Sequence, residues 1–327
     1  MNIYTQAQIM SSLCPGDAAA LIAEGFIAHA NGLVQLPPIQ SLQFPASNGD
    51  CCVKSAWMLG DEVFSVRVSA GFYDNPAKGF SSNDGLTLIF SALTGQPVAL
   101  LRDGGWLTSM RTALAGQIVA RAMAPSHVSG IGVVGTGDQA RMQLEQLMPV
   151  TACRRLTVYG RNRQGLEQYC EFAEALGFDV AATQDAKDVA TNSNLIVTAT
   201  PSREAIIANE WVNPGTHITA IGADSLGKQE LDVRLVERAD VIVVDSIEQC
   251  CQFGEISGAL KSGLIDKGRL VALGSVLSGH AIGRQDDTQI TVADLTGLGV
   301  QDAQIAKCAM SSLVDSEAIR RGLNDEA

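Results

Sequence analysis

From residue 131 onward the chain repeats one pattern, in which a short, unbroken apolar run is followed by an amphipathic stretch. The apolar runs are residues 131–134, 156–159, 194–201, 217–224 and 240–245, and helical stretches are expected at 140–147, 165–176 and 232–238. Apolar runs without alternation are typical of strands that are buried on both faces of a parallel sheet. The pattern therefore predicts an α/β fold with a doubly wound parallel sheet.

The first 120 residues follow a different pattern. Short strands are expected at 51–58 and 63–70, with turns rather than crossover helices between them, and helices at 10–30 and 107–122. This arrangement predicts an α+β domain. A short helix is expected near the end of the chain, at 316–323, with Ser316 as its N-cap.

A glycine-rich turn follows the first run of the parallel sheet. It reads Gly135-Thr136-Gly137-Asp138-Gln139-Ala140. Gly135 permits the turn, Gly137 lets the backbone approach a phosphate, and Ala140 lets the next helix pack closely on the strand. Free N–H groups at a helix N-terminus favour an anion. The turn therefore predicts a Rossmann-type dinucleotide site, to which Thr198, Ala199 and Thr200 at the end of a neighbouring strand also contribute.

The residues after the second strand bear on the choice of cofactor. Enzymes that use NAD commonly place a carboxylate there, but this chain reads Arg161-Asn162-Arg163. Two guanidinium groups can pair with a 2′-phosphate, which a carboxylate would repel. We therefore expect NADPH to be preferred, with NADH possible; the alternative is a solvated basic turn.

Composition narrows the class of protein. The net charge of −12 argues against nucleic acid and anionic membranes as partners, and no apolar run is long enough to span a bilayer. The eight cysteines and four histidines show no metal-ligand spacing, so no metal is expected. With no export signal, reduced thiols and a cytoplasmic location are expected. His217, which opens a strand, is expected to be a packed or edge residue rather than a catalyst.

Three cations in the first domain require a partner or a cleft. Lys54 and Arg67 lie inside apolar strands, where a charge is costly unless it is paired or faces outward. Arg111 begins a helix of small residues from Thr112 to Gly116, which suggests close approach by another element or by a cofactor. Its guanidinium can bind a substrate carboxylate through two hydrogen bonds, and the alternative is a structural ion pair.

Several stretches together resemble the ornithine cyclodeaminase/mu-crystallin family over nearly the whole chain. They are residues 65–69 to Asn75, 93–100, Leu107-Thr108 with 111–113, 135–140, 222–224 with Lys228 and 230–231, and Thr296-Gly297 with Gln301-Asp302. The resemblance implies a homodimer and a discontinuous first domain for substrate binding and dimerisation. The expected domains are therefore residues 1–120 plus 300–327, and a dinucleotide-binding domain at 121–299.

The resemblance also implies roles for individual residues. Members of the family use a nicotinamide cofactor on amino acids or their imines. Arg111 matches the arginine that binds the substrate carboxylate, and Arg111-Thr112 are also candidate cofactor contacts. Asp224 matches the aspartate near the reacting nitrogen, and the nicotinamide is expected near Thr296-Gly297.

This chain departs from the family pattern at two places. Arg67 stands where the family has a lysine near the substrate, and Lys54 on the preceding strand is a candidate for that task. Gln40 replaces an arginine that the family often has in the Pro37-Pro38 region. These changes favour reduction of a cyclic imine over cyclodeamination, because reduction requires only a carboxylate anchor, a proton source and a hydride face.

The sequence therefore predicts an NADPH-dependent reductase of a small cyclic imino acid, best matched by Δ1-pyrroline-2-carboxylate, which gives L-proline. Asp224 and Lys54 are the candidate catalytic residues, and Arg111, Lys54 and Arg67 the candidate substrate contacts. One alternative is ornithine cyclodeaminase, which forms L-proline and ammonia from L-ornithine. The other is a crystallin-like protein that binds NADPH and a small ligand without turnover.

Overall fold

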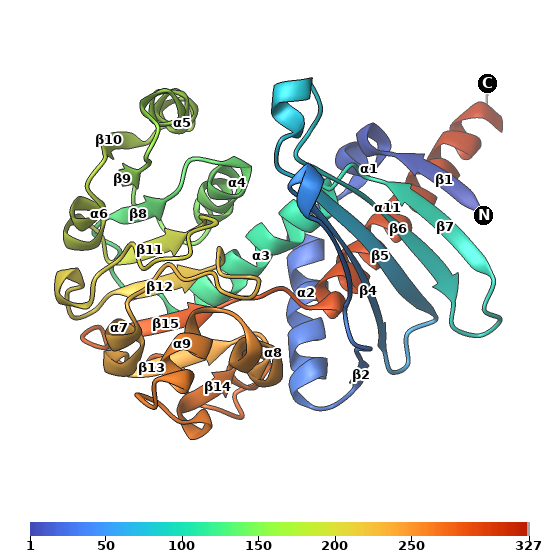
Figure 1. Ribbon diagram of the computed structural model, residues 1–327. Helices are drawn as coiled ribbons and strands as arrows, with labels where there is room; N and C mark the ends of the chain where they lie inside the picture. Colours follow the sequence, from blue (N-terminus) through green and yellow to red (C-terminus); the bar gives the residue numbers. More distant parts are fainter. Residues whose placement is uncertain (326–327) are drawn as a thin grey trace. The chain divides into compact units, whose positions relative to one another are not determined.

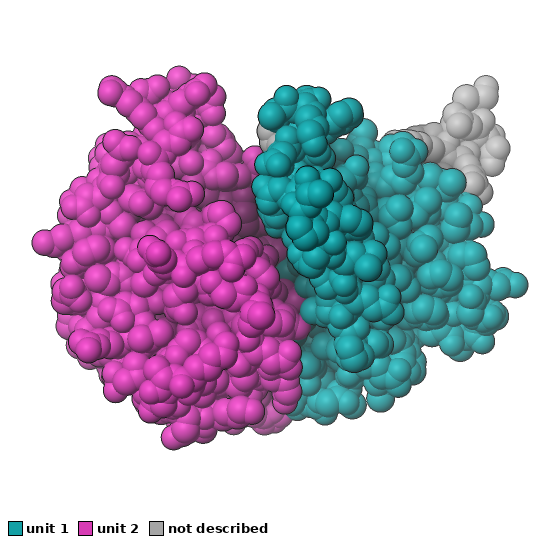
Figure 2. All heavy atoms as spheres, in the orientation of Figure 1, with its two compact units in different colours: residues 1–111, 298–327 teal, residues 112–297 magenta. Residues whose placement is uncertain are grey.

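The computed structural model describes residues 1–325 and contains two separate sheets (Figure 1). The chain divides into two compact units, which Figure 2 distinguishes by colour. Unit 1 comprises residues 1–111 and the segment from 298 onward, and unit 2 comprises 112–297. The first division falls between Arg111 and Thr112 in helix α3 (Trp106–Met123), and the expected boundary after residue 120 lies later in the same helix.

Unit 1 is built on a seven-stranded sheet in which the strand order is β1-β7-β6-β5-β4-β2, with β3 also paired to β4. Only the β1–β7 pair is parallel; the other pairs are antiparallel. The strands are β1 (Asn2–Thr5), β2 (Val34–Gln35), β3 (Gln40–Phe44), β4 (Gly49–Met58), β5 (Val63–Phe72), β6 (Asn83–Ser91) and β7 (Pro97–Arg102). An antiparallel sheet with helices is the α+β architecture expected for this part of the chain.

Helices α1 (Gln6–Ser12), α2 (Pro15–Ala30) and α11 (Gly299–Asp325) complete unit 1. The expected single helix over residues 10–30 is wrong, because Pro15 occupies the first turn of a new helix and Leu13 ends the previous one in an extended conformation. The expected N-cap at Ser316 is also wrong: this residue lies inside α11, which continues through it. Helix α11 contacts β4, β5 and β6.

Unit 2 contains an eight-stranded, entirely parallel sheet. Its order is β10-β9-β8-β11-β12-β15-β13-β14. The strands are β8 (Ile131–Val134), β9 (Arg155–Tyr159), β10 (Asp179–Thr183), β11 (Leu195–Thr198), β12 (His217–Ala220), β13 (Val241–Val244), β14 (Leu270–Ala272) and β15 (Thr291–Asp294). The chain runs outward from β8 in one direction through β9 and β10, and then in the other from β11, so the order reverses between β8 and β11. Ligands of open α/β sheets bind at the carboxyl ends of strands at such a reversal.

Helices connect the strands of unit 2. They are α4 (Asp138–Leu147), α5 (Arg163–Ala175), α6 (Ala186–Asn192), α7 (Val233–Arg238), α8 (Ile247–Gln252), α9 (Glu255–Lys261) and α10 (Leu273–Leu277). Buried residues of α6, α7 and α9 form one core cluster with the strand residues Ile196, Ile218 and Ile242. Helix α4 contacts β8 and β11. The predicted doubly wound, Rossmann-type sheet is confirmed.

Over residues 1–325, none of the helices is long and apolar enough to cross a membrane. The same residues contain no group of three or more histidine, cysteine or acidic side chains placed to hold a metal ion.

Candidate functional site

The glycine-rich turn lies at the reversal of strand order in unit 2. Gly135 has a φ of +119°, and a Cβ there would lie 2.7 Å from the carbonyl oxygen of Ala199, at the end of β11. Gly137 is the N-cap of α4 and no side chain caps this helix. A Cβ on Gly137 would meet no atom within 4 Å, so the space before the helix N-terminus is open. Ala140 is fully buried. This geometry suits a dinucleotide phosphate.

The basic turn after β9 lies beside the glycine-rich turn. A Cβ on Gly160 would lie 2.7 Å from Cγ2 of Thr136, and one on Gly165 would lie 3.1 Å from its Oγ1. Asn162 caps α5 by accepting a hydrogen bond from the backbone N–H of Gln164. Both arginines of the turn are exposed, and Arg163 pairs with Glu167 at 3.1 Å. Arg161 is therefore the better placed of the two for a ligand phosphate.

At the end of β11, two threonines bind the same buried carboxyl group. The hydroxyl of Thr198 donates to Oε2 of Glu230 at 2.7 Å, and the backbone N–H and hydroxyl of Thr200 donate to Oε1 at 2.6 and 2.7 Å. The side chains of Thr198 and Glu230 are both fully buried. The hydroxyl groups of both threonines thus serve an internal contact. Ala199 and Thr200 are half-buried, whereas Thr198 is fully buried, and they are therefore the better candidates for contact with a cofactor.

Asp224 follows β12 by four residues. Its side chain is 54% exposed, and its Oδ1 accepts a hydrogen bond from Nζ of Lys228 at 2.6 Å. The two residues are four positions apart in the sequence. An exposed carboxylate at the carboxyl edge of the sheet is accessible to a substrate, and the lysine gives it a local partner.

Thr296 and Gly297, beyond β15, are held by Asp245 at the end of β13. The Asp245 carboxylate accepts from the hydroxyl of Thr296 at 3.0 Å and from the backbone N–H of Gly297 at 2.7 Å. Gly297 has a φ of +85°, a conformation that favours glycine. These bonds fix the backbone at the expected nicotinamide position.

Buried carboxyl groups line this edge of the sheet. Burial raises the pKa of Glu230, and it raises those of Glu255 and Asp294 well above their usual range. The negative charge of Glu230 adds to the shift of Glu255. The hydrogen bonds described for them come from backbone N–H, hydroxyl, amide and thiol groups. Folding therefore favours the protonated forms of these groups.

In unit 1, Lys54 and Arg67 face each other across β4 and β5, and Thr87 on β6 continues the row. Arg67 is buried and forms an ion pair with the fully buried Asp103. Arg67 also donates to Thr87 Oγ1 and to Ser69 Oγ, both at 3.1 Å. The cation in this strand is therefore paired, as its position required. Arg67 Nη2 is buried without a hydrogen-bond partner.

Arg111 is held by two residues of α11. Its Nε donates to Oδ1 of Asp302 at 3.0 Å and its Nη1 to Oε1 of Gln301 at 2.8 Å. The side chains of Arg111 and Asp302 are only 8% and 4% exposed. The structural ion pair considered as an alternative thus exists, but these bonds do not use Nη2 and use only one N–H of Nη1. These two bonds fix the orientation of the guanidinium.

The small-residue helix after Arg111 has its own explanation in unit 2. A Cβ on Gly116 would lie 2.0 Å from Oε1 of Gln143 in α4. Nε2 of Gln143 donates to the carbonyl oxygen of Thr112 at 3.0 Å. The expected close approach by another element is confirmed, and that element is α4.

Four residues that support these groups carried no predicted role: Asp103, Glu230, Gln301 and Asp302. A buried arginine requires an acidic partner, so Arg67 and Arg111 signalled that partners exist. The sequence did not say which of the many carboxylates they are, because the partners of Arg111 are 190 and 191 residues away.

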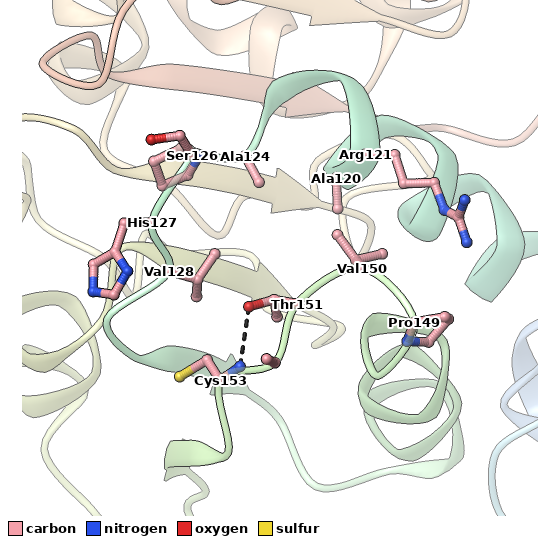
Figure 3. Close-up of a pocket in the computed structure, with 12 residues that line it drawn as sticks. Ala120, Arg121, Ala124, Ser126, His127, Val128, Pro149, Val150, Thr151 and Cys153 are labelled. Atoms are coloured by element: carbon pink, nitrogen blue, oxygen red, sulfur yellow. Dashed lines mark hydrogen bonds between the residues drawn. The ribbon is translucent and has the colours of Figure 1, made fainter.

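A pocket of about 730 Å³ lies in unit 2, at the amino ends of β8 and β9 (Figure 3). Its polar lining residues are Arg121, Ser126, His127, Thr151 and Cys153. The backbone N–H of Cys153 donates to Oγ1 of Thr151 at 3.1 Å. None of the predicted site residues lines this pocket, which is at the edge of the sheet opposite the glycine-rich turn.

Comparison with known proteins identifies the class. A profile of the ornithine cyclodeaminase/mu-crystallin family matches residues 1–317, and the chain belongs to this family. An uncharacterised cyclodeaminase of Sinorhizobium fredii (strain NBRC 101917 / NGR234) is 36% identical over 97% of each chain.

Two solved structures share the fold across the chain. An archaeal alanine dehydrogenase dimer with bound NAD is 33% identical, with a TM-score of 0.90 over 97% of each chain. The Δ1-pyrroline-2-carboxylate reductase of Thermococcus litoralis, in complex with NADH and L-proline, is 26% identical, with a TM-score of 0.91 over 97% of this chain and 98% of that one.

Proposed function

We propose that this protein catalyses the NADPH-dependent reduction of a small cyclic imino acid, with Δ1-pyrroline-2-carboxylate as the preferred substrate and L-proline as the product. The observation that carries the proposal is the fixed orientation of Arg111, whose Nε and Nη1 are bound by Asp302 and Gln301. A buried guanidinium held in this way is prepared to bind a planar carboxylate without further ordering. The related reductase with bound L-proline supports the choice of ring.

The substrate carboxylate is assigned to unit 1. A guanidinium has five N–H groups, and the bonds to Asp302 and Gln301 use two of them. The N–H of Nη1 that does not bind Gln301 and one N–H of Nη2 are proposed as the pair that binds two carboxylate oxygens. Lys54, opposite Arg67 in the sheet, is the second candidate contact. The family has a lysine at the position of Arg67, and we propose that Lys54 performs the task of that lysine.

The reacting nitrogen is assigned to Asp224 in unit 2. An imine carbon accepts hydride most readily when its nitrogen is protonated. Asp224 stabilises that cation or delivers its proton, as a positioned carboxylate at the end of a strand can. When bound, the nicotinamide cofactor supplies the hydride.

The residues of unit 2 fit such a cofactor. The open space before Gly137 and the uncapped N-terminus of α4 suit its phosphates. The turn itself includes Thr136, Asp138 and Gln139. The proposed contacts on the nicotinamide side are Ala199, Thr200, Thr296 and Gly297. Arg161 is proposed to bind the 2′-phosphate that distinguishes NADPH. Asn162 and Arg163, which bind Gln164 and Glu167, shape that turn.

Two other reactions have support of their own. The alanine dehydrogenase is 33% identical, against 26% for the pyrroline carboxylate reductase, which favours oxidation of a linear amino acid as a second candidate. The 36% identity to an uncharacterised cyclodeaminase favours cyclodeamination as a third, for which the family name suggests L-ornithine as the substrate. All three reactions need residues that anchor a carboxylate and assist at nitrogen. The substrate that the protein accepts therefore distinguishes the three reactions.

One panel of steady-state assays tests the proposal. We expect NADPH to be oxidised faster with Δ1-pyrroline-2-carboxylate than with the six-membered cyclic imine or with iminopropanoate. The fall in absorbance of the reduced cofactor measures this rate. Ammonia release from L-ornithine without net cofactor consumption would instead establish the cyclodeaminase. Formation of reduced cofactor from L-alanine, without reduction of the cyclic imines, would establish the dehydrogenase. Binding of NADPH with none of these reactions would establish a binding protein.

A further inference from the structure

The carboxyl ends of β11 and β12 are joined by one side chain that has no assigned role. Glu230, in the segment between β12 and α7, accepts four hydrogen bonds. Thr198 and Thr200, at the end of β11, supply three of them, and the backbone N–H of Gly222, beyond β12, supplies the fourth at 2.9 Å.

These bonds begin where the sheet stops. The last ladder bond between the two strands runs from the backbone N–H of Ile221 to the carbonyl oxygen of Thr198. One residue further on, Gly222 approaches β11 so closely that a Cβ would lie 2.2 Å from the carbonyl oxygen of Thr200 and 2.5 Å from Oε2 of Glu230. Only glycine fits this position, and the carboxyl group takes over the pairing that the ladder no longer provides.

The backbone of Glu230 is itself held by a second buried glutamate, Glu255. Oε1 of Glu255 accepts from the backbone N–H of Glu230 at 2.7 Å, and its Oε2 accepts from that of Leu231 at 2.9 Å. Both glutamates are fully buried. The carboxyl group of Glu230 is therefore fixed through its backbone as well as through its side chain.

We propose that Glu230 is a positioning residue, which locks the two strand ends together and thereby fixes Thr200 and Asp224 relative to each other. Asp224 lies two residues beyond Gly222, and Thr200 donates both its backbone N–H and its hydroxyl to the same carboxyl group. The roles of Thr200 at the cofactor and of Asp224 at the nitrogen rest on the proposed function; the joining of the strands does not.

The substitution Glu230→Gln tests this proposal with a change of a single atom. Oε1 binds the backbone N–H of Thr200, and Oε2 binds that of Gly222. An amide has one acceptor oxygen and one NH₂ group, so in either orientation it places a donor against one of these two N–H groups. One strand end therefore loses its bond while side-chain volume is kept.

Asn194→Asp is the matched control at the opposite edge of the same sheet. Asn194, just before β11, accepts from the backbone N–H of Ser129 and donates to the carbonyl oxygen of His127, both at 2.9 Å. The acid places an acceptor against that carbonyl oxygen, so the control creates one mismatch of the same kind away from the proposed site.

Hydrogen exchange reports on the joining of the two strand ends, and steady-state kinetics reports on the reaction. By hydrogen exchange, Glu230→Gln is expected to speed exchange in the peptide that contains Thr200 or in the one that contains Gly222, whereas Asn194→Asp speeds exchange only in the segment around His127 and Ser129. In the imine reduction, Glu230→Gln is expected to lower kcat about tenfold to a hundredfold, because small displacements of reacting groups are costly. The KM for the imino acid is expected to stay within about twofold, since its carboxylate is assigned to Arg111 in unit 1. The control is expected to leave both constants unchanged.

Unchanged exchange at Thr200 and Gly222 in Glu230→Gln would overturn the proposal. So would faster exchange combined with wild-type kcat. If the wild-type protein reduces no imine, the proposed function fails, and the Kd for NADPH is then measured in place of kcat. A Kd that is unchanged in Glu230→Gln despite faster exchange would overturn the positioning role. If Glu230→Gln does not fold, Thr198→Val removes a single bond to Oε2 and is judged by the same exchange and kinetic readouts, with smaller expected effects.

Discussion

Two arginines of unit 1 are buried, and each has a buried acidic partner. Arg67 pairs with Asp103, and Arg111 with Asp302. Taking an arginine out of water is costly, and removing one partner leaves the other charge uncompensated. These pairs fix the orientation of both guanidinium groups, so a substitution of either arginine tests geometry as much as charge.

The first prediction concerns the carboxylate anchor. Arg111→Lys keeps the charge beside Asp302 but loses the planar pair of N–H groups. We expect the KM for the imino acid to rise about tenfold or more, the scale of one charge-assisted hydrogen bond. The comparison is with an imine that lacks the carboxylate: if Arg111→Lys slows that analogue equally, the arginine acts on the fold or the cofactor instead.

The second prediction concerns the cofactor. Arg161 is exposed, and its turn lies beside Thr136. Arg161→Ala is expected to weaken NADPH binding by about 1–3 kcal/mol and to leave NADH binding nearly unchanged, because only NADPH carries the 2′-phosphate. Fluorescence titration with both cofactors measures this, with Arg163→Ala as the matched variant. Equal losses for NADPH and NADH would show that Arg161 does not recognise the phosphate.

The third prediction concerns Asp224. Asp224→Asn removes the acid and its charge while keeping its size. We expect kcat to fall by about 10²-fold or more, the usual scale for a positioned proton donor, and the affinity for NADPH to persist. Single-turnover kinetics with saturating NADPH measures the chemical step, and wild-type turnover in this variant would remove Asp224 from the mechanism.

At the scale of an element, strand β12 begins with a fully buried histidine, His217, as its position in an apolar run led us to expect. Its ring nitrogens bind the hydroxyl groups of Thr291 and Thr219 at 2.8 and 3.0 Å. Burial, with a smaller contribution from the charge of Arg284, lowers the pKa of His217 to about 3. The imidazole is therefore neutral in the folded protein and acts as part of the core.

The fourth prediction follows from this shift. In the unfolded chain a histidine titrates near pH 6.5, so the unfolded state takes up a proton below that pH and the folded state does not until about pH 3. The stability from this group is complete above pH 6.5 and is lost as the pH falls, by about 1.4 kcal/mol per pH unit. Urea unfolding of wild type and His217→Gln at pH 7 and pH 5 measures the difference, which should shrink at the lower pH.

The buried carboxyl groups act in the opposite direction. The pKa values of Glu255 and Asp294 are raised, so their contribution is present at low pH and is lost as the pH rises through their folded-state pKa values. For this reason the prediction uses the difference between wild type and variant, in which the carboxyl contributions cancel. A difference that does not change with pH would contradict the assigned histidine shift.

At the scale of the whole molecule, one face of the sheet in unit 1 is apolar and only half-buried. The fully buried side chains of β5, such as Ser65 and Arg67, lie on one face, whereas Val66 lies on the other. Val66 faces Leu88 on β6, which faces Leu100 on β7, and all three are half-buried. Phe64 and Phe90 stack in the same face at 5.1 Å. An apolar surface of this kind favours association.

The fifth prediction is that a second copy of the chain covers this face. We propose a homodimer, as in the related alanine dehydrogenase dimer. Light scattering is expected to give about twice the chain mass of 34.4 kDa. Leu88→Lys places a charge in the apolar row and is expected to yield monomers. Leu93→Lys, at an 83% exposed position in the turn after β6, is the control and should remain dimeric. A monomeric wild type would exclude the homodimer.

The sequence by itself determined five of the eight strands of unit 2 and the place of the glycine-rich turn, whereas β10, β14 and β15 were not predicted. Continuous apolar runs specify parallel strands, and Gly135, with a φ of +119°, specifies a turn that no other residue makes as easily. These features are local: each depends on residues within one strand, one turn or one helix. Where local signals conflicted, as between the apolar periodicity of residues 10–30 and Pro15, the covalent restriction of proline decided the boundary.

Only the tertiary structure decided which polar groups meet. The partners of Arg111 lie 190 and 191 residues away, and Glu230 joins two strand ends that are 32 and 8 residues from it. A buried charge requires a partner, and a strand end requires an acceptor, but many side chains in the sequence meet either need. The choice among them depends on how the strands are ordered in the sheet and on which helix returns to it. For that reason the candidate ligand-binding residues could be proposed from motifs, whereas the contacts by which Asp103, Asp302 and Glu230 hold them could not.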